Sequence, residues 1–582
     1  MRISQTFDRA RRLIVPLAMM VALSACGGGG GGGGGGSGSG GGPAGPAPAP
    51  VPAGPTAADA GRLLTQATFG PTDADIEAVL ATGYSGWIDQ QIAAQSSSHL
   101  TYLDNRLAQL RLTNANANLG ANNFYESFWL YSATSPAQLR ERMKLALSEI
   151  FVISVVDANI DVRGAGSYYD MLGANAFGNY RTLLEQVALH PMMGVYLTLM
   201  GNQKEDARTG RNPDENFARE VLQLMSLGVH ELNADGTVRR DGANNPIPTY
   251  TPSDISNLAR VFTGLSWYSA TPTTATFSGA GRTPDSYVRP MIAYPSFHST
   301  SAKTFLGTTI PQGSNDAGTD VKIALDTIFA HPNVPPFICK QLIQRLVTSN
   351  PSPAYVGRCS ASFVNNGSGV RGDLAAVVRA ILLDAEARDT SASAVTTYGK
   401  VREPVVRMAH WMRAFGATSA SGNYLLNSTS ANTSLGQSAL ASSSVFNFFR
   451  PGYVPPNTRL SAQNLTAPEM QIVDEVTVAG YANTMQAAIG NGIGSGNDVR
   501  SAYTREIAIA GDANALADRM NRLLLNGTMS TALRARLVES LNSVTVPATT
   551  GTNQATIDTA LLNRSKLAVY MTMVSPDYLV QR

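Results

Sequence analysis

The segment LRERMKLALSEIF, residues 139–151, carries the pattern that decides the fold. Its apolar residues Leu139, Met143, Leu147 and Ile150 recur every three or four positions, so they share one face of an α-helix. The basic residues between them are expected on the other faces. The segment therefore predicts an amphipathic helix that packs one apolar stripe against a core.

Similar helix signals continue on both sides of this segment. Further apolar runs with helical spacing each follow a residue that can cap a helix, and some of them have a proline or an acid in the first turn. These starts lie at residues 72–75, 251–254, Asn333, Asp373 and 466–469. No repeat of fixed period is visible, which argues against a solenoid.

Two stretches interrupt the helical pattern, at residues 268–300 and 418–443. The first is rich in Thr, Ser, Gly and Pro and contains the β-prone residues Thr276, Phe277 and Tyr287, which predict a loop or a small hairpin. The second is rich in Ser, Asn and Thr and predicts a loop. We therefore expect a mainly α fold, a large multi-helix globular body that is either single or bilobed, with small β-hairpin or loop inserts.

The first 25 residues have the features of a secretory signal. A basic start precedes the apolar residues 13–23, and the small residues Ser24 and Ala25 lead to Cys26. About 11 apolar residues are too few to span a bilayer, whereas this order of basic, apolar and small residues is typical of a cleaved leader. The alternative to a lipoprotein leader is an ordinary signal peptide that ends near a cysteine.

Residues 23–26, Leu-Ser-Ala-Cys, resemble the lipobox of bacterial lipoproteins. The resemblance implies that Cys26 carries lipid and anchors the chain at a membrane, for which more than one acyl chain gives stable binding. Gly27 stands where an Asp would favour retention in the inner membrane, so we expect the outer membrane, on either its periplasmic or its surface face.

Residues 26–56 are expected to form the lipidated cysteine and a flexible stalk, ahead of a helical domain over 57–582. Residues 27–42 are almost pure glycine and residues 43–55 alternate Pro with Ala and Gly, so neither part can build a core. Removal of the leader leaves 40 basic and 41 acidic residues. This balance argues against a nucleic-acid partner, which would favour a clustered positive surface.

In addition to Cys26, the sequence contains two cysteines, Cys339 and Cys359. In an oxidising compartment they could form a disulfide, and the alternative is a pair of buried free thiols. They do not have the Cys-x-x-Cys spacing of a metal site.

Several blocks of the chain resemble a large bacterial family known as Domain of Unknown Function 1800. The blocks are RLLTQATFG (62–70), QLRER (138–142), YD (169–170), FGNYR (177–181), HPMM (190–193), ENFARE (215–220), LG (227–228), KTFLG (303–307), REP (402–404) and FNFFRPGY (446–453). The resemblance implies an exported, mostly helical protein without an established activity. It also implies a possible partner, because members are often encoded beside exported proteins similar to the sulfatase and alkaline-phosphatase superfamily.

The densest group of chemically capable residues lies at 214–230. On a helix, Glu215 and Arg219 are i,i+4 neighbours, and Glu220 follows on the next position. One hypothesis is a polar site in which Glu215 or Glu220 acts as a general base or metal ligand and His190 or His230 supplies a nitrogen. The alternative is an ion-pair and capping network that only fixes helix packing.

Other polar groups could join this site. The pairs and runs at 179–181, 402–403 and 447–450 lie beside apolar segments and could converge on the same interior as Glu220. His190 and His331 each precede a proline, where an imidazole can bond the last carbonyls of a helix. No His-x-x-x-His or Glu-x-x-His spacing occurs, so the sequence identifies no helical metal site and leaves the cofactor open.

Two classes of function fit these observations. The first is a lipid-anchored envelope protein without catalytic activity that binds or helps assemble another exported protein. The second is a periplasmic or surface hydrolase, with or without a metal ion, that uses the helix over 215–220.

Overall fold

The computed structural model describes residues 54–389, 395 and 397–582. The expected leader, the lipidation site Cys26 and the stalk up to residue 53 lie outside the described residues. The described chain is mainly helical, and its strands are two or three residues long. The mainly α fold with small β inserts is therefore confirmed.

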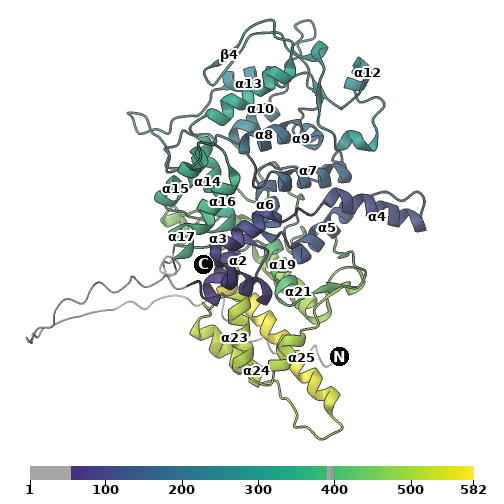
Figure 1. Ribbon diagram of the computed structural model, residues 1–582, viewed down its shortest axis with the longest axis vertical. Coiled ribbons are helices and arrows are strands. Elements are labelled where there is room, and N and C mark those ends of the chain that lie inside the picture. The colour runs from purple at the N-terminus through teal and green to yellow at the C-terminus, as the bar shows by residue number, and fades with distance from the viewer. Residues whose placement is uncertain (1–53, 390–394, 396) are drawn as a thin grey trace, which may run out of the picture.

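The helices follow one another through the whole chain (Figure 1). The first are α2 (Ala57–Ala67), α3 (Asp73–Ala93), α4 (His99–Thr113), α5 (Ala121–Thr134), α6 (Gln138–Ser148), α7 (Val162–Ala174), α8 (Tyr180–Leu189), α9 (Pro191–Tyr196), α10 (Asn216–Gln223), α11 (Pro252–Val261) and α12 (Thr274–Phe277). Next come η2 (Pro284–Tyr287), η3 (Pro295–Phe297), α13 (Ala317–Ala330), α14 (Val334–Leu346), α15 (Pro353–Val364), α16 (Leu374–Leu383) and α17 (Ala385–Arg388). The last are α19 (Pro404–Ala414), α20 (Arg459–Ala462), η4 (Pro468–Ile472), α21 (Glu475–Asn491), η5 (Ser495–Asn497), α22 (Thr504–Ile509), α23 (Ala513–Leu524), α24 (Thr531–Asn542), α25 (Gln554–Met573) and α26 (Pro576–Leu579).

Within the described residues, the strands form four separate antiparallel pairs. They are β1 (Leu265–Ser266) with β2 (Ile292–Ala293), β3 (Lys303–Phe305) with β4 (Thr308–Ile310), β5 (Lys400–Val401) with β8 (Val580–Gln581), and β6 (Thr418–Ser419) with β7 (Val499–Arg500). Pairing of β5 with β8 ties the last residues of the chain to the segment before α19. The sheets therefore fasten loops and the C-terminus onto a helical body.

Helix α6 lies at the centre of this body. Its apolar stripe is buried as the sequence predicts, and Arg142 and Lys144, which were expected on the other faces of the helix, are buried as well. Lys144 forms an ion pair with Glu141, and Arg142 forms one with Glu403. These partners make burial of the two cations tolerable. Helix α6 is thus enclosed on every side rather than amphipathic.

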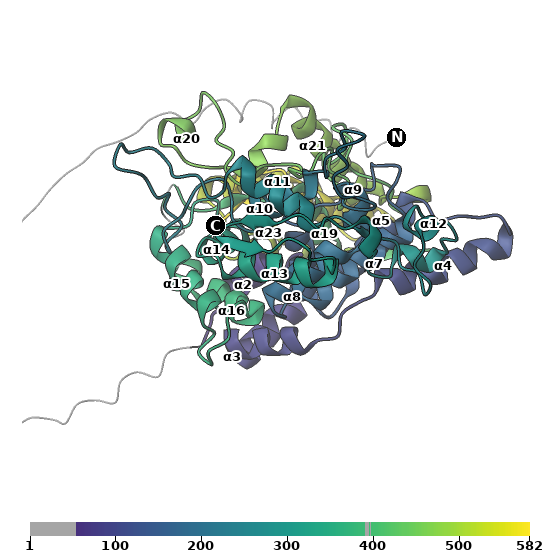
Figure 2. The same ribbon diagram turned by 90° about the horizontal axis from the view of Figure 1, so that it is seen from above.

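The buried apolar side chains form one contiguous core that runs from Ala60 to Tyr578. Helices α8 to α13 lie at one end of the long axis and α23 to α25 at the other, with α2, α3, α6 and α19 between them (Figure 1). Helix α4 projects from one side in both views (Figure 2). The continuous core favours a single body over a bilobed one.

The insert at 268–300 differs in detail from the expected loop or small hairpin. Thr276 and Phe277 lie in the short helix α12, and Tyr287 ends the 3₁₀ helix η2, so these β-prone residues do not form strands. The strand of this insert is β2, which pairs with β1 just before it. Each helical turn begins after a threonine with a capping box, and this local pattern overrides the β propensity.

The capping signals predicted most helix starts but not all. Thr72 and Thr251 form capping boxes at α3 and α11, as expected. At residues 466–469 the element is the 3₁₀ helix η4, which starts after Ala467 without a side-chain cap. Thr466 instead donates to the main-chain oxygen of Ser349 at 2.9 Å, so a long-range contact takes the place of the local cap.

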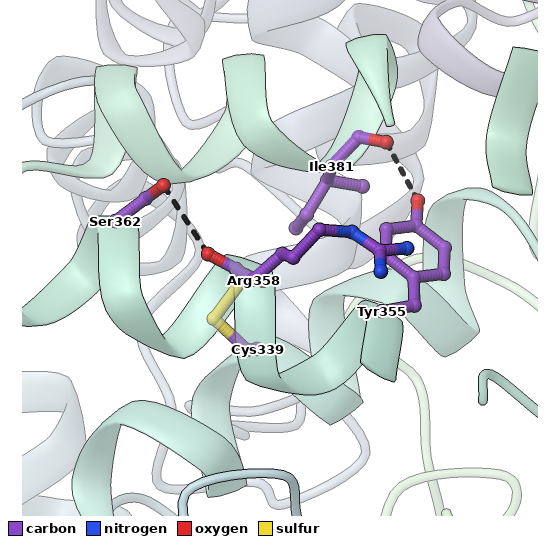
Figure 3. Close-up of a disulfide and its surroundings, with 6 residues drawn as sticks. Cys339, Tyr355, Arg358, Ser362 and Ile381 are labelled. Atoms are coloured by element: carbon purple, nitrogen blue, oxygen red, sulfur yellow. Dashed lines mark hydrogen bonds between the residues drawn. A yellow bond between two sulfur atoms is a disulfide. The ribbon is translucent and has the colours of Figure 1, made fainter. Parts of the chain in front are cut away.

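A disulfide joins α14 to α15 through Cys339 and Cys359, whose Cα atoms are 5.8 Å apart (Figure 3). Both cysteines are buried. Helix α15 is also fixed to α16 by the Tyr355 hydroxyl, which donates to the main-chain oxygen of Ile381 at 2.6 Å. The bond therefore holds two helices that contribute side chains to the interior.

No helix within residues 54–389 and 397–582 combines the length and the apolarity that crossing a bilayer requires.

Candidate functional site

The residues predicted on the helix over 215–220 do not share one environment. Glu215 precedes α10 and forms an ion pair with Arg219 at 3.1 Å, and both side chains are exposed. Glu220 faces the interior, and its Oε2 has no hydrogen-bond partner. Burial raises the pKa of Glu220, and the charge of Arg219 only partly offsets this effect.

One of the two candidate histidines is buried, and the other is exposed to solvent. His190 is buried at the start of α9, where its Nδ1 accepts from the main-chain nitrogen of Met192 at 3.2 Å. It thus caps the N-terminus of α9. His331 lies at the end of α13, and its Nδ1 accepts from the main-chain nitrogen of Asn333, so neither imidazole makes the expected contact with the last carbonyls of a helix. Burial lowers the pKa of His190 to about 3. His230 is exposed.

These five residues therefore do not form a connected site. Within the described part of the chain, no hydrogen bond or ion pair joins Glu220 to His190 or to His230. The same part contains no cluster of three or more His, Cys, Asp or Glu side chains placed to hold a metal ion.

A different group of charged residues does converge, and its centre is Glu149. Glu149 directly follows α6, Arg345 lies in α14, and Glu403 precedes α19. Residues 402–403 and 447–450 were expected to converge on the interior of Glu220, and Glu403 and Asn447 do not do so. The interior that they reach is that of Glu149, not that of Glu220.

The ionic contacts in this cluster are short and fully buried. Arg142 Nη2 lies 3.3 Å from Glu403 Oε1, and Lys400 Nζ lies 2.9 Å from Glu469 Oε1 and 3.7 Å from Glu403. Arg345 Nε lies 3.3 Å from Glu149 Oε2. Three cations and three carboxyl groups therefore share a space from which water is largely excluded, where the attraction between oppositely charged groups is strong and removal of an ionised partner is expensive.

Glu149 and Glu403 form a carboxyl–carboxylate pair. Burial and the adjacent negative charge of Glu403 raise the pKa of Glu149 well above its ordinary value. Burial alone would also raise the pKa of Glu403, but Lys400 and Arg142, with hydrogen bonds from Glu149 and Gln437, lower it to about 2. Of the two groups, Glu149 therefore has the stronger tendency to hold a proton and Glu403 the stronger tendency to be ionised.

The pair lies beside a small hollow. Glu149, Gln437, Ser442, Asn447 and Phe448 are among the residues that line it, and the enclosed space is about 10 Å³. This is room for about one water molecule. Both Oε atoms of Glu149 lack a donor among the described N–H and O–H groups, and Asn447 Nδ2 also has no partner.

Local structure explains how the mouth of this hollow is built. Asn447 adopts a left-handed backbone with φ 62°, a conformation that asparagine tolerates better than most residues. Gln437 comes from the insert at 418–443 and donates from Nε2 to Glu403 Oε2 at 2.8 Å. The loop-rich insert and the FNFFRPGY block therefore close over the charged pair.

Sequence reasoning missed Glu149 because the segment 139–151 looked amphipathic. Acidic and basic residues on an amphipathic helix usually face water, and nothing local distinguishes those that do not. The signal that could have found the site is the recurrence of charged residues directly beside apolar residues, at 138–142 and 402–404.

A match to a known protein family extends over almost all of this body. A family model described as "Protein of unknown function (DUF1800)" matches residues 62–580. No curated protein and no solved structure matches the chain. The matched residues run from α2 to β8 and include Glu149, Glu403 and the disulfide. The chain therefore belongs to the DUF1800 family of proteins of unknown function.

Proposed function

We propose that this chain is a lipid-anchored protein of the cell envelope that binds another exported protein. The observation that carries the proposal is that the packed body begins directly after the Gly-rich and Pro-rich segment of the sequence. Helix α2 begins at Ala57 with a capping box between Thr56 and Asp59, and its next turns are already buried in the core. A Gly-rich and Pro-rich stalk from Cys26 would thus hold a compact body away from the lipid surface.

Two further features support this proposal. The buried Cys339–Cys359 disulfide suits an oxidising compartment outside the cytoplasm. Helix α4 projects from the body, and Leu112 near its end is 87 % exposed, which offers an apolar contact to a partner (Figure 1). The favoured partner is an exported protein of the sulfatase and alkaline-phosphatase superfamily, and Gly27 favours the outer membrane as the site of the anchor.

The Cys26→Ser variant tests both parts of the proposal. We expect the wild-type protein in the membrane fraction together with the co-expressed partner, and the variant with its partner in the soluble fraction, because the serine cannot be lipidated. Fractionation followed by affinity purification of the tagged chain measures this. Retention of the variant in the membrane would contradict the lipid anchor. Failure to recover the partner with either form would contradict the binding function.

A hydrolase is the second candidate function, and two specific observations favour it. Glu149 has a raised pKa and lies beside a hollow, and Glu220 has a raised pKa and an unpartnered oxygen, so both carboxyl groups are candidates for general acid–base catalysis. The hollow at Glu149 would have to open to admit a substrate, since it has room for about one water.

Single substitutions of Glu149 and Glu220 distinguish which of the two carboxyl groups would act in catalysis. If the chain is a hydrolase that uses Glu149, Glu149→Gln should reduce turnover by at least about 100-fold, the scale of general acid–base catalysis, while Glu220→Gln leaves it unchanged. The reverse result would assign the role to Glu220. A panel of ester, phosphoester and peptide substrates on the purified body measures this. Absence of turnover by wild-type protein across that panel would exclude the hydrolase.

A further inference from the structure

A cavity of about 260 Å³ lies at the C-terminal end of α21, where this helix packs against α25 and β7 (Figure 1). Within the described part of the chain, residues 488–492 form one part of its lining, and Arg500, Ser501 and Lys566 form the rest. At about 30 Å³ for each water molecule, the cavity has room for about nine, so its occupant is a small ligand. It shares no lining residue with the hollow at Glu149, so the two spaces are separate.

The lining of this cavity contains two cations and no carboxyl group. Arg500 belongs to β7 and Lys566 to α25, so the two positive charges reach the cavity from different elements. Burial lowers the pKa of Lys566, and no carboxylate among the described residues offsets this effect. The cavity therefore has a positive potential that favours an anionic ligand.

Both cations have N–H groups beyond those that their own hydrogen bonds use. Lys566 Nζ donates to the main-chain oxygen of Gly490 at 2.6 Å, which is one of the three bonds an ammonium group can donate. Arg500 donates from Nε to the main-chain oxygen of Asn497 at 2.7 Å and from Nη2 to that of Gly496 at 3.2 Å. These neutral partners hold both side chains in place without cancelling their charge, so an anion can accept from the remaining N–H groups.

Gly492 allows Arg500 to reach the end of the helix. Its backbone is left-handed with φ 91°, and a Cβ atom at this position would overlap the Arg500 side chain and crowd the main-chain oxygen of Val499. The stem of Arg500 therefore lies directly against the residue that follows α21.

The last carbonyl groups of α21 supply a second kind of contact. Carbonyl oxygens at a helix C-terminus have no partner within the helix, and each can accept two hydrogen bonds. Gly490 already accepts one bond there, from Lys566. Hydroxyl groups of a ligand are suitable donors to such oxygens.

We propose that this cavity binds a small phosphate monoester that carries hydroxyl groups. The phosphate contacts Arg500 and Lys566, and the hydroxyl groups donate to the last carbonyls of α21. A phosphate monoester has a charge of about −1.5 to −2 at pH 7, which matches the two cations better than a single carboxylate does.

Isothermal titration calorimetry with glycerol 3-phosphate, on the purified protein at constant ionic strength, tests the site. We expect saturable binding of one molecule per chain. Arg500→Gln and Lys566→Gln should each raise the dissociation constant by about tenfold or more, because each removes a charge-assisted contact. Arg536→Gln is the matched control, since it removes an exposed positive charge of α24 outside the cavity and should leave binding unchanged.

Three further ligands test the parts of the proposal separately. Inorganic phosphate lacks the hydroxyl-bearing carbons, glycerate has a carboxylate in place of the phosphate, and glycerol has no charge. Each should bind at least about tenfold more weakly than glycerol 3-phosphate. Unfolding midpoints of the variants without ligand, equal to that of wild-type protein, would show that weaker binding does not result from misfolding. The proposal is overturned if glycerol 3-phosphate does not bind, if both glutamine variants bind it as wild-type protein does, or if any of the three other ligands binds equally well.

Discussion

Replacement of Glu403 by glutamine is expected to lower the free energy of unfolding by roughly 3–5 kcal/mol, the scale measured when one partner of a buried ion pair is removed. Glu403 is the ionised carboxyl that faces Lys400 and Arg142, with its pKa lowered to about 2. A neutral amide would leave these cations buried with less compensating charge. Denaturant unfolding at neutral pH measures the loss.

The matched variant Glu149→Gln should behave differently although it changes the same residue type in the same cluster. The raised pKa of Glu149 favours its neutral form, and a neutral glutamine amide can donate to Glu403 in its place. We therefore expect a loss below about 1 kcal/mol, in the range of a volume-conserving exchange with the hydrogen bond kept. Equal losses for the two variants would contradict the assignment of the proton to Glu149.

The pH dependence of stability gives this pair a second signature. In the folded protein, the pKa of Glu403 lies below its ordinary value of 4.5. Its stabilising contribution to the free energy of unfolding is therefore present above pH 4.5 and is lost as the pH falls towards about 2. In the folded protein, the pKa of Glu149 is raised. Its stabilising contribution to the free energy of unfolding is therefore present at low pH and is lost as the pH rises through this raised pKa. Glu403→Gln should therefore flatten the acid limb of the stability profile, and Glu149→Gln the alkaline limb.

Much of the fold follows from local sequence patterns. Periodicity predicts the helical class, and threonine capping boxes predict the starts of α3 and α11, because both depend on residues within one or two turns. In the insert at 268–300, β propensity does not predict where the strands form, since the β-prone residues Thr276 and Phe277 lie in the short helix that Thr273 caps. Local hydrogen bonds outweigh propensity in such short elements.

The charged cluster could not be predicted in the same way. Its acids come from the end of α6, the start of α19 and the 3₁₀ helix η4, and no spacing along the chain relates these positions. The local pattern around Glu215 and Arg219 is clear in the sequence, and it describes an exposed i,i+4 ion pair. Such pairs contribute about 0.3–0.5 kcal/mol, so the clearest local signal belongs to the weaker interaction.

Removal of the disulfide by Cys339→Ala with Cys359→Ala is expected to lower the free energy of unfolding by roughly 3 kcal/mol, because the bond closes a loop of 20 residues and restricts the unfolded chain. Denaturant unfolding of both proteins, with and without a reductant, measures this. The difference should vanish when the unfolded chains are held reduced. A difference that persists in reductant would show that side-chain packing, and not the covalent bond, accounts for the loss.

The same bond connects stability to the compartment in which the chain folds. Both cysteines are buried, so a reductant should not reach the bond in the native protein, and protection should last until unfolding. A chain made without residues 1–25 and kept in a reducing cytosol should fold without the bond and match the double-alanine variant in stability. Wild-type protein recovered from the envelope should have the higher value. If both preparations have the lower value, the cysteines are free thiols in the cell, and the disulfide no longer supports an exported location.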